Sequence, residues 1–387
     1  MTDQVETVPF ALPDITEAEV SAVVNAMRSG WLTTGPNSKA FENEFASSLG
    51  GDLETVAVNS ATSGLHLALD ALGLGVGDEV LVPTWTFTAT AEVVRYVGAT
   101  PVFIDVDPVT LNIDLEAAER AVTPNTRAII PVHFAGLPVP ALLLHQFAQR
   151  HDIRVIEDAA HAFPVRSDGS YVGNGRSDGV VFSFYATKTI TTGEGGMLVT
   201  GDHGLANRAR IMRLHGISHD AFDRYRSSTP RWKYEVIAPG FKYNLTDIAA
   251  AVGRVQLSRA TQMGNARARI AARYTGEFSQ LPLQLPAGPS EWGGHAWHLF
   301  TIRLLNDAPM GRDEFIDSMA RAGVVASVHF IPLHLQPYWR SAYGLRVGNY
   351  PVATEASSRI VSLPIYSAMT DRQIDRVVEL VTRLLGA

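Results

Sequence analysis

The sequence predicts an α/β protein in which a large domain with a mainly parallel, seven-stranded sheet is followed by a smaller C-terminal α+β domain. The chain has 387 residues, more than one hydrophobic core usually serves, so we expect two domains that share a cleft. Seven short apolar runs rich in β-branched residues occur between residues 56 and 200, and amphipathic segments separate several of them. This alternation is typical of a parallel sheet covered by crossover helices.

Each apolar run has the length of one buried strand, and the segments between the runs have the period of a helix. The predicted strands are Val56–Val58, Glu79–Val82, Pro101–Asp105, Ala128–His133, Arg154–Glu157, Gly179–Phe184 and Met197–Thr200. The predicted crossover helices are Leu65–Leu72, Ala89–Tyr96 and Ala141–Gln149.

A longer helical pattern marks the change of domain. It covers roughly Thr246–Phe278 and leads into a proline-rich break at Leu281–Pro289. We therefore predict a large domain over residues 1–250 and a small domain with the linking helix over residues 251–387. The first ~15 residues are available to pack on the small domain. The remainder of the small domain has the pattern strand, helix, strand, helix.

Composition and charge exclude several classes of protein. Hydrophobic residues make up 46% of the chain and charged residues 18%, which is a globular balance. The net charge of −7, with no basic block, gives no footprint for a nucleic-acid partner. The sequence contains no cysteine, which fits a reducing cytoplasm, and we expect no metal site. Prolines interrupt the longest stretch without charged residues, Ala128–Gln149, so we expect no membrane span.

A carboxylate and a lysine follow two of the predicted strands. Asp158 ends one strand, and Lys188 lies just beyond the strand that ends at Phe184. In a parallel sheet both side chains would project from the carboxyl edge, where ligands bind. The pair suits pyridoxal phosphate (PLP), because the carboxylate can keep the pyridine nitrogen protonated while the lysine forms a Schiff base. Taken singly, Asp158 is explained by a helix cap or salt bridge and Lys188 by a solvated surface position.

Small and hydroxyl residues at Ser60–Gly64 lie between a predicted strand and the helix expected to begin near Leu65. Backbone amides and the helix dipole favour a phosphate there, although ordinary N-capping is the commoner explanation of such a segment. Ser183, on the strand before the lysine, can add a hydroxyl to the phosphate site. Phe87 follows another strand and can stack on the pyridine ring, with core packing as its alternative.

Glycine-rich segments help to distinguish cofactor types. The run Thr192–Gly196 would let the backbone approach a bound ring closely, and a tight hairpin turn is its alternative. The run Gly73–Gly77 follows a helix rather than a strand and lacks the dinucleotide spacing. The sequence also lacks the Gly-Lys-Ser/Thr element of a P-loop. A nicotinamide oxidoreductase is therefore disfavoured.

With these residues in view, the chain closely resembles the DegT/StrS type of sugar aminotransferase, a PLP-dependent family with the fold-type I architecture of aspartate aminotransferase. The resemblance runs nearly from end to end, and the segments together are far more specific than any one of them. The matching segments are Gly30–Pro36, Asn59–Leu69, Thr84–Thr90, Gly98–Asp107, Glu157–His161, Phe182–Phe184 with Lys188, Thr192–Gly196, Gly240–Asp247 and Ser362–Pro364.

The resemblance implies a role for each matching position. Lys188 would be the Schiff-base lysine and proton shuttle, and Asp158 the partner of the pyridine nitrogen. Phe87 would stack on the ring, and His161 would lie near the ring hydroxyl unless it is simply a buried, satisfied histidine. The phosphate would be held by Ala61, Thr62 and Ser183.

The segment Gly240–Asn244 departs from the family's commoner Gly-x-Asn-Tyr-Arg version and resembles members that act on C4 of a keto-sugar. Either Lys242 or Asn244 would reach the phosphate from the neighbouring subunit, which implies a homodimer with shared active sites. The segment Ser327–His334 also resembles the C4 members, in which its first histidine lies near the sugar site; a strand followed by a loop is the alternative for this segment. The resemblance thus implies Trp31, Thr33 and His329 as substrate residues.

The implied reaction moves an amino group from glutamate to a keto-sugar carried by a nucleoside diphosphate, at C4. Amination at C3 is one alternative. A PLP-dependent sugar dehydratase is another, although in those relatives histidine replaces the lysine found here at Lys188. A non-catalytic, regulatory homologue is the third, and the intact pair of Asp158 and Lys188 disfavours it.

Overall fold

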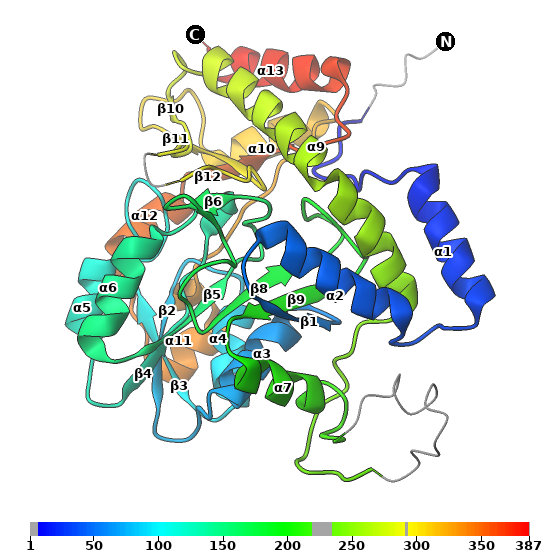
Figure 1. Cartoon of the computed structure of the whole chain (residues 1–387). Coiled ribbons are helices and arrows are strands. Elements are labelled where there is room, and N and C mark those ends of the chain that lie inside the picture. Colours follow the sequence, from blue (N-terminus) through cyan, green and yellow to red (C-terminus); the bar gives the residue numbers. More distant parts are fainter. Residues whose placement is uncertain (1–6, 219–233, 291–292, 387) are drawn as a thin grey trace.

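Seven strands form one large sheet in the computed structural model, which describes residues 7–218, 234–290 and 293–386 (Figure 1). All seven strands predicted from the sequence are confirmed. They are β1 (Glu54–Val58), β2 (Glu79–Pro83), β3 (Thr100–Ile104), β4 (Thr126–Ile129), β5 (Arg154–Asp158), β8 (Gly179–Ser183) and β9 (Gly196–Thr200).

The order of the strands is β1-β9-β8-β5-β4-β2-β3. The pairs from β8 to β3 are all parallel, whereas β9 is antiparallel to both β8 and β1. The sheet is therefore mainly parallel, as predicted, and β9 is its one reversed strand. Because β5 and β8 are parallel neighbours, the segments that follow them leave the sheet at the same edge.

Helices cover both faces of this sheet. Helices α3 (Ala61–Ala71), α4 (Ala89–Tyr96) and α7 (His203–Met212) pack on one face, where Val56, Val58 and Val181 are buried. Helices α2 (Pro36–Leu49), α5 (Leu115–Ala121) and α6 (Ala141–His151) pack on the other, against alternate residues such as Ala57 and Val180. The short elements η1 (Phe134–Gly136), β6 (Arg166–Ser167) and β7 (Ser170–Tyr171) complete this part of the chain.

A second, three-stranded antiparallel sheet forms a separate core. It consists of β10 (Leu283–Gln284), β11 (Phe300–Leu304) and β12 (Ile360–Leu363), covered by α10 (Arg312–Arg321) and α13 (Asp371–Leu385). Helix α9 (Asp247–Glu277) runs from the large sheet to this second core, where its end lies beside α13 (Figure 1). The N-terminal segment reaches the same core, because Val8 is fully buried in it and pairs with Val324.

The segment between α10 and β12 differs from the predicted alternation. Between α10 and β12 there is no regular strand; single residues form bridges, Val324 to Val8 and Ser327 to Ser362. The chain instead continues through η2 (Leu333–Leu335), α11 (Pro337–Tyr343), η3 (Val347–Asn349) and α12 (Pro351–Ser357). Leu333, Trp339 and Ala353 of this segment pack into the core of the large sheet. Part of the predicted small domain thus packs on the large sheet, and the division into domains of residues 1–250 and 251–387 stays a prediction.

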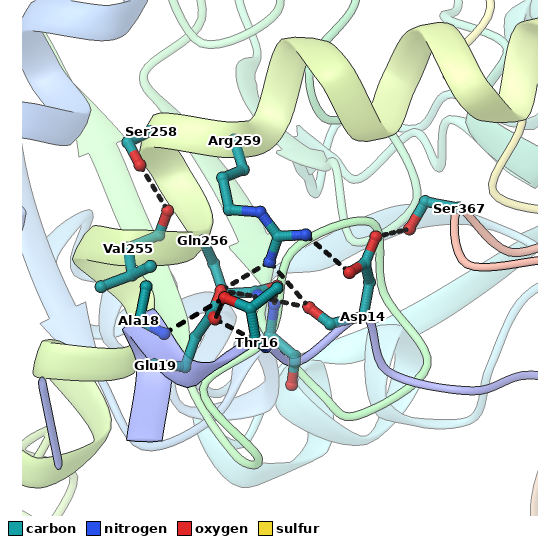
Figure 2. A network of polar contacts seen from close by, with 10 residues as sticks. Asp14, Thr16, Ala18, Glu19, Val255, Gln256, Ser258, Arg259 and Ser367 are labelled. Atoms are coloured by element: carbon teal, nitrogen blue, oxygen red, sulfur yellow. Dashed lines mark hydrogen bonds and ion pairs between the residues drawn. The ribbon is translucent and has the colours of Figure 1, made fainter. Parts of the chain in front are cut away.

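A polar network ties the N-terminal segment to helix α9 (Figure 2). Arg259 donates to a carboxylate oxygen of Asp14 at 2.6 Å and to Glu19 at 2.7 Å. Glu19 lies in the first turn of helix α1 (Glu17–Ser29), and with the N-cap residue Thr16 it forms a reciprocal capping box. Burial alone would raise the pKa of Glu19, but hydrogen bonds from Thr16, Arg259 and Gln256 lower it to about 2.

The same network extends to the segment that follows the lysine. Gln256 donates to Glu19 at 2.7 Å, and its amide oxygen accepts from the backbone amide of Thr191 at 3.3 Å. The hydroxyl of Thr191 in turn donates to the carbonyl of Phe184 at 3.0 Å. Gln256 of α9 thus fixes the segment between β8 and β9, which contains Lys188.

Candidate active site

Asp158 and Lys188 face one cavity at the carboxyl edge of the large sheet. Asp158 is the last residue of β5, and Lys188 lies five residues beyond the end of the neighbouring strand β8. The cavity has a volume of about 380 Å³. It is lined by Ser60, Ala61, Thr62, Leu65, Thr86, Phe87, Ala89, Val132, Asp158, Ala160, His161, Ser183, Tyr185, Thr187, Lys188, Glu194, Gly195, His298, His329 and Phe330.

The carboxylate of Asp158 is buried and fixed in orientation. One oxygen accepts a hydrogen bond from the hydroxyl of Thr90 at 2.8 Å, and the other accepts from the amide of Ala160 at 3.1 Å. Burial raises the pKa of Asp158 above its usual value, while these two hydrogen bonds and the charge of Lys188 oppose the rise. A cationic partner in the cavity, such as a protonated pyridine ring, would favour the ionised carboxylate.

The amine of Lys188 is far less basic than a surface lysine. Burial lowers its pKa from 10.5 to about 8; the charge of Asp158 works against this change, and the guanidinium of Arg267 adds to it. At pH 7 about a tenth of this amine is therefore uncharged, far more than for an ordinary lysine. Only the uncharged amine can attack a carbonyl or accept a proton.

The phosphate cradle is part of a helix rather than a loop ahead of it. Helix α3 begins at Ala61, four residues before the predicted start at Leu65, because Ser60 caps it and accepts from the amide of Ser63 at 3.1 Å. Ala61 and Thr62 line the cavity, and their amides, in the first turn of α3, have no acceptor inside the helix. Ser183 lines the cavity from β8. These donors suit the phosphate of PLP.

Glycine is required where β9 begins beside this cradle. A side-chain carbon on Gly196 would lie 2.7 Å from the amide nitrogen of Ala61 and 2.7 Å from the carbonyl carbon of Ser60. Both contacts are with backbone that is fixed by the start of α3. Within the Thr192–Gly196 run, Gly196 thus lies where two chain segments approach closely, and Gly193 adopts a left-handed backbone angle of φ 80°.

Aromatic and imidazole rings form the remaining walls of the cavity. Phe87 is 60% exposed and lies on the rim, 6.1 Å from the ring of Phe330. His161 is buried, and its ring packs 4.3 Å from the ring of His298. His329 stacks on Phe10 at 5.1 Å, while its Nδ1 lies 2.9 Å from the hydroxyl of Ser362.

Four of the predicted site residues lie outside the cavity of this chain. Trp31, Thr33, Lys242 and Asn244 do not line it. Three of them gather in a separate cluster, where the amine of Lys242 donates to the side-chain oxygen of Asn244 at 2.6 Å and Asn244 in turn lies 3.4 Å from the hydroxyl of Thr33. Lys242 and Thr33 are exposed in the isolated chain.

Two residues that contact Asp158 or Lys188 directly were not predicted from the sequence. Thr90 holds the carboxylate of Asp158, and the Nε2 of His298 lies 3.5 Å from the amine of Lys188. Thr90 lay within a matching segment, but a threonine in the first turn of a helix gives no signal of this contact. His298 lies 110 residues from Lys188 in the sequence, in an apolar stretch that reads as strand.

The fold and the site define a PLP-dependent enzyme of the aminotransferase fold. A lysine and a buried carboxylate share one cavity with a helix N-terminus, and this set of groups fits the amine, ring nitrogen and phosphate contacts that PLP needs. More particularly, the chain belongs to the DegT/DnrJ/EryC1/StrS aminotransferase family, whose profile matches residues 13–382.

Individual relatives support the same assignment. SpsC of Bacillus subtilis (strain 168), a spore coat polysaccharide biosynthesis protein, is 43% identical over 375 residues, which cover 96% of each protein. Spr1654 of Streptococcus pneumoniae, assigned as a sugar aminotransferase, has in its PLP form a TM-score of 0.90 at 33% identity, over 98% of this chain and 100% of that chain.

Helicobacter pylori PseC, an aminotransferase involved in the biosynthesis of pseudoaminic acid, has a TM-score of 0.89 at 25% identity, over 98% of this chain and 99% of PseC. The protein described here is thus a PLP-dependent sugar aminotransferase.

In the described part of the chain, no helix is both long and apolar enough to cross a bilayer.

Proposed function

We propose that this enzyme transfers the amino group of glutamate to C4 of a keto-sugar linked to a nucleoside diphosphate. The observation that carries the proposal is the single cavity in which the amine of Lys188 and the buried carboxylate of Asp158 meet. The preference for C4 rests on the resemblance of the Gly240–Asn244 and Ser327–His334 segments to C4 enzymes. His329, within the second segment, lines the cavity.

Lys188 is proposed to hold the cofactor and then to move protons. When bound, PLP supplies an electrophilic carbonyl and a ring that withdraws electrons from the carbon being deprotonated. The amine of Lys188, with its pKa lowered to about 8, would accept the proton from the α-carbon of glutamate and deliver it to the former aldehyde carbon of the cofactor, on the other side of the transferred nitrogen. In the second half-reaction the same amine moves a proton in the reverse direction, so the kinetics are ping-pong.

The other cavity residues are proposed to bind and orient the cofactor. Asp158, held by Thr90, keeps the ring nitrogen protonated. The amides of Ala61 and Thr62 and the hydroxyl of Ser183 hold the phosphate at the positive end of α3. Additional residues complete the ring's surroundings: Phe87 covers one face, and His161 lies at the ring hydroxyl.

A homodimer with shared active sites accounts for the residues that this chain does not bring to its own cavity. Lys242 and Asn244 form a polar cluster with Thr33, part of it exposed. A cation and an amide in that position can complete the phosphate site of a neighbouring subunit, and Trp31 and Thr33 can line its sugar site. The absence of cysteine suits the reducing cytoplasm in which we propose that the enzyme works.

The experiment that tests this proposal is product identification. The purified enzyme is incubated with glutamate and a panel of thymidine- and uridine-diphosphate-linked 3-keto and 4-keto sugars, including a hexose and a pentose. NMR of the product then locates the new amine. We expect amination at C4; amination at C3 would refute the position. Loss of water without gain of nitrogen would indicate a dehydratase, and binding without turnover a regulatory homologue.

A further inference from the structure

His298 places a neutral imidazole beside the amine of Lys188. Its Nε2 lies 3.5 Å from the lysine nitrogen, at the outer limit of a hydrogen bond. The side chain is buried at 6% exposure and lines the catalytic cavity. Burial, the charge of Lys188 and the neighbouring His161 and Arg267 lower the pKa of His298 well below its usual value. The imidazole can therefore accept a hydrogen bond from the lysine.

The backbone before His298 adopts a conformation that is unfavourable for its residue type. Trp297 has a left-handed φ of 51°, which only glycine adopts readily. Its ring stacks on His295 with centroids 3.8 Å apart and planes 5° from parallel. Such a conformation persists only where the surroundings fix it, and it is common at functional sites. Here it precedes the one residue of the segment whose ring reaches the lysine.

A buried arginine fixes this segment from the other side. Arg267 on α9 is 3% exposed and donates to the carbonyls of Trp297 and His298, each at 3.3 Å, and to the carbonyl of Ile365 at 2.8 Å. These three carbonyls belong to the segments that enter β11 and leave β12. The guanidinium thus holds the backbone of His298 in place across two elements of the second core.

We propose that His298 is a positioning residue: its Nε2 accepts a hydrogen bond from the free amine of Lys188 and aims the lone pair of that nitrogen at the carbon to be deprotonated. This inference rests on the proposed role of Lys188 and goes beyond cofactor binding. An acceptor Nε2 requires the ring proton on Nδ1. The lysine donates one hydrogen to the ring and keeps its lone pair free.

Without this acceptor the amine would explore the several rotamers of the lysine chain. A misplacement of about 1 Å can cost on the order of 100-fold in rate. We therefore expect His298→Phe to lower the single-turnover rate with glutamate ~10- to 100-fold, with the KM for glutamate unchanged. A single-turnover rate does not depend on the fraction of enzyme that is active, so partial misfolding would not mimic this result.

Three further variants separate positioning from packing. His298→Gln offers an amide oxygen as acceptor and should restore much of the rate. His298→Met is a second apolar replacement if the phenylalanine variant does not fold. His151→Phe is the matched control, because it makes the same replacement on α6, outside the catalytic cavity. It should retain the wild-type rate.

A measurement that does not depend on turnover completes the test. In the enzyme loaded with pyridoxamine phosphate, Lys188 is a free amine whose pKa can be measured by competitive acetylation and mass spectrometry. The charged groups that influence this amine, Asp158 and Arg267, are unchanged in the variants. A hydrogen bond to His298 stabilises the ammonium form more than the amine. We expect the pKa of Lys188 to fall in His298→Phe and to return in His298→Gln.

The outcomes are distinct. If Lys188 titrates identically in wild type, His298→Phe and His298→Met, and the single-turnover rates agree, the inference is wrong. If the wild-type enzyme accepts no amino group from glutamate, the proposed donor is wrong, while the titration of Lys188 still decides the role of His298.

Discussion

Replacing Gly196 with alanine should weaken cofactor binding through the phosphate cradle. The added carbon would lie 2.7 Å from the amide nitrogen of Ala61 and from the carbonyl carbon of Ser60, and 2.8 Å from the carbonyl oxygen of Ser60. Ordinary contact begins at 3.4 Å, so one of the two segments must recede by about 0.7 Å. Because both contacts are with backbone, no side chain can relieve them, and a shift of the start of α3 displaces the amide of Ala61.

A displacement of this size removes a hydrogen bond. An amide donor at about 2.9 Å from a phosphate oxygen would move to about 3.6 Å, beyond hydrogen-bonding distance. A hydrogen bond to a charged group contributes about 1.5–3 kcal/mol, so the Kd should rise roughly 10- to 150-fold. The same overpacking should also cost about 1–3 kcal/mol in the free energy of unfolding.

Titration with pyridoxamine phosphate isolates this effect, because that ligand forms no covalent bond with Lys188. Gly201→Ala is the matched control: Gly201 directly follows the same strand, and an added carbon there meets nothing within 4 Å. We expect the control to bind like the wild type. If Gly196→Ala binds pyridoxamine phosphate as tightly as Gly201→Ala, the start of α3 does not hold the phosphate.

Three other predictions concern the site and the contacts that stabilise the fold around it. Asp158→Ala should retain Lys188 chemistry but slow proton removal greatly, roughly 100-fold or more, in single-turnover experiments with glutamate; an unchanged rate would refute the role of the carboxylate. The lowered pKa of Glu19 contributes stability that is fully present above its usual value of 4.5 and is lost as the pH falls toward 2. Chemical denaturation should therefore show that the wild type loses its advantage over Glu19→Gln across that range, and a pH-independent difference would contradict the assignment. Glu42→Gln should lower the free energy of unfolding by ~3–5 kcal/mol, because Glu42 is ion-paired with the buried Arg213. The control Glu44→Gln should lower it by under about 1 kcal/mol, because the ion pair of Glu44 with Arg254 is exposed. Equal losses in the two variants would refute this argument.

The large sheet could be predicted from the sequence because its strands are buried on both faces. Runs such as Val56–Val58 and Gly179–Phe184 are continuous and apolar, and their spacing allows a helix between them. The antiparallel direction of β9 could not be predicted, because a buried strand has the same composition in either direction. The helix Asp247–Glu277 was predicted to within a residue at each end, since Thr246 caps it and a proline-rich break follows.

The packing of residues 333–357 could not be predicted in the same way. Short helices with apolar faces, such as α11 and α12, fit either core equally well by pattern. Only the three-dimensional arrangement shows that Trp339 and Ala353 belong to the core of the large sheet.

Some residues of the site could be predicted from the sequence, and others could not. Lys188, Asp158 and the start of α3 lie at the ends of predicted strands, so the sheet topology alone brings them together. Thr90 and His298 reach the site from a helix and from the second core. Their contacts depend on side-chain direction and on a left-handed turn at Trp297, which local sequence does not reveal.

The most direct test of the central claim is to locate the covalent attachment of the cofactor. The chain contains four lysines, Lys39, Lys188, Lys233 and Lys242. Reduction of the PLP-loaded enzyme with borohydride, followed by digestion and mass spectrometry, identifies the lysine that carries the added mass. We predict that the cofactor is found on Lys188 and that Lys188→Ala loses both this adduct and turnover. Attachment to another lysine, or turnover by Lys188→Ala at the wild-type rate, would contradict the account.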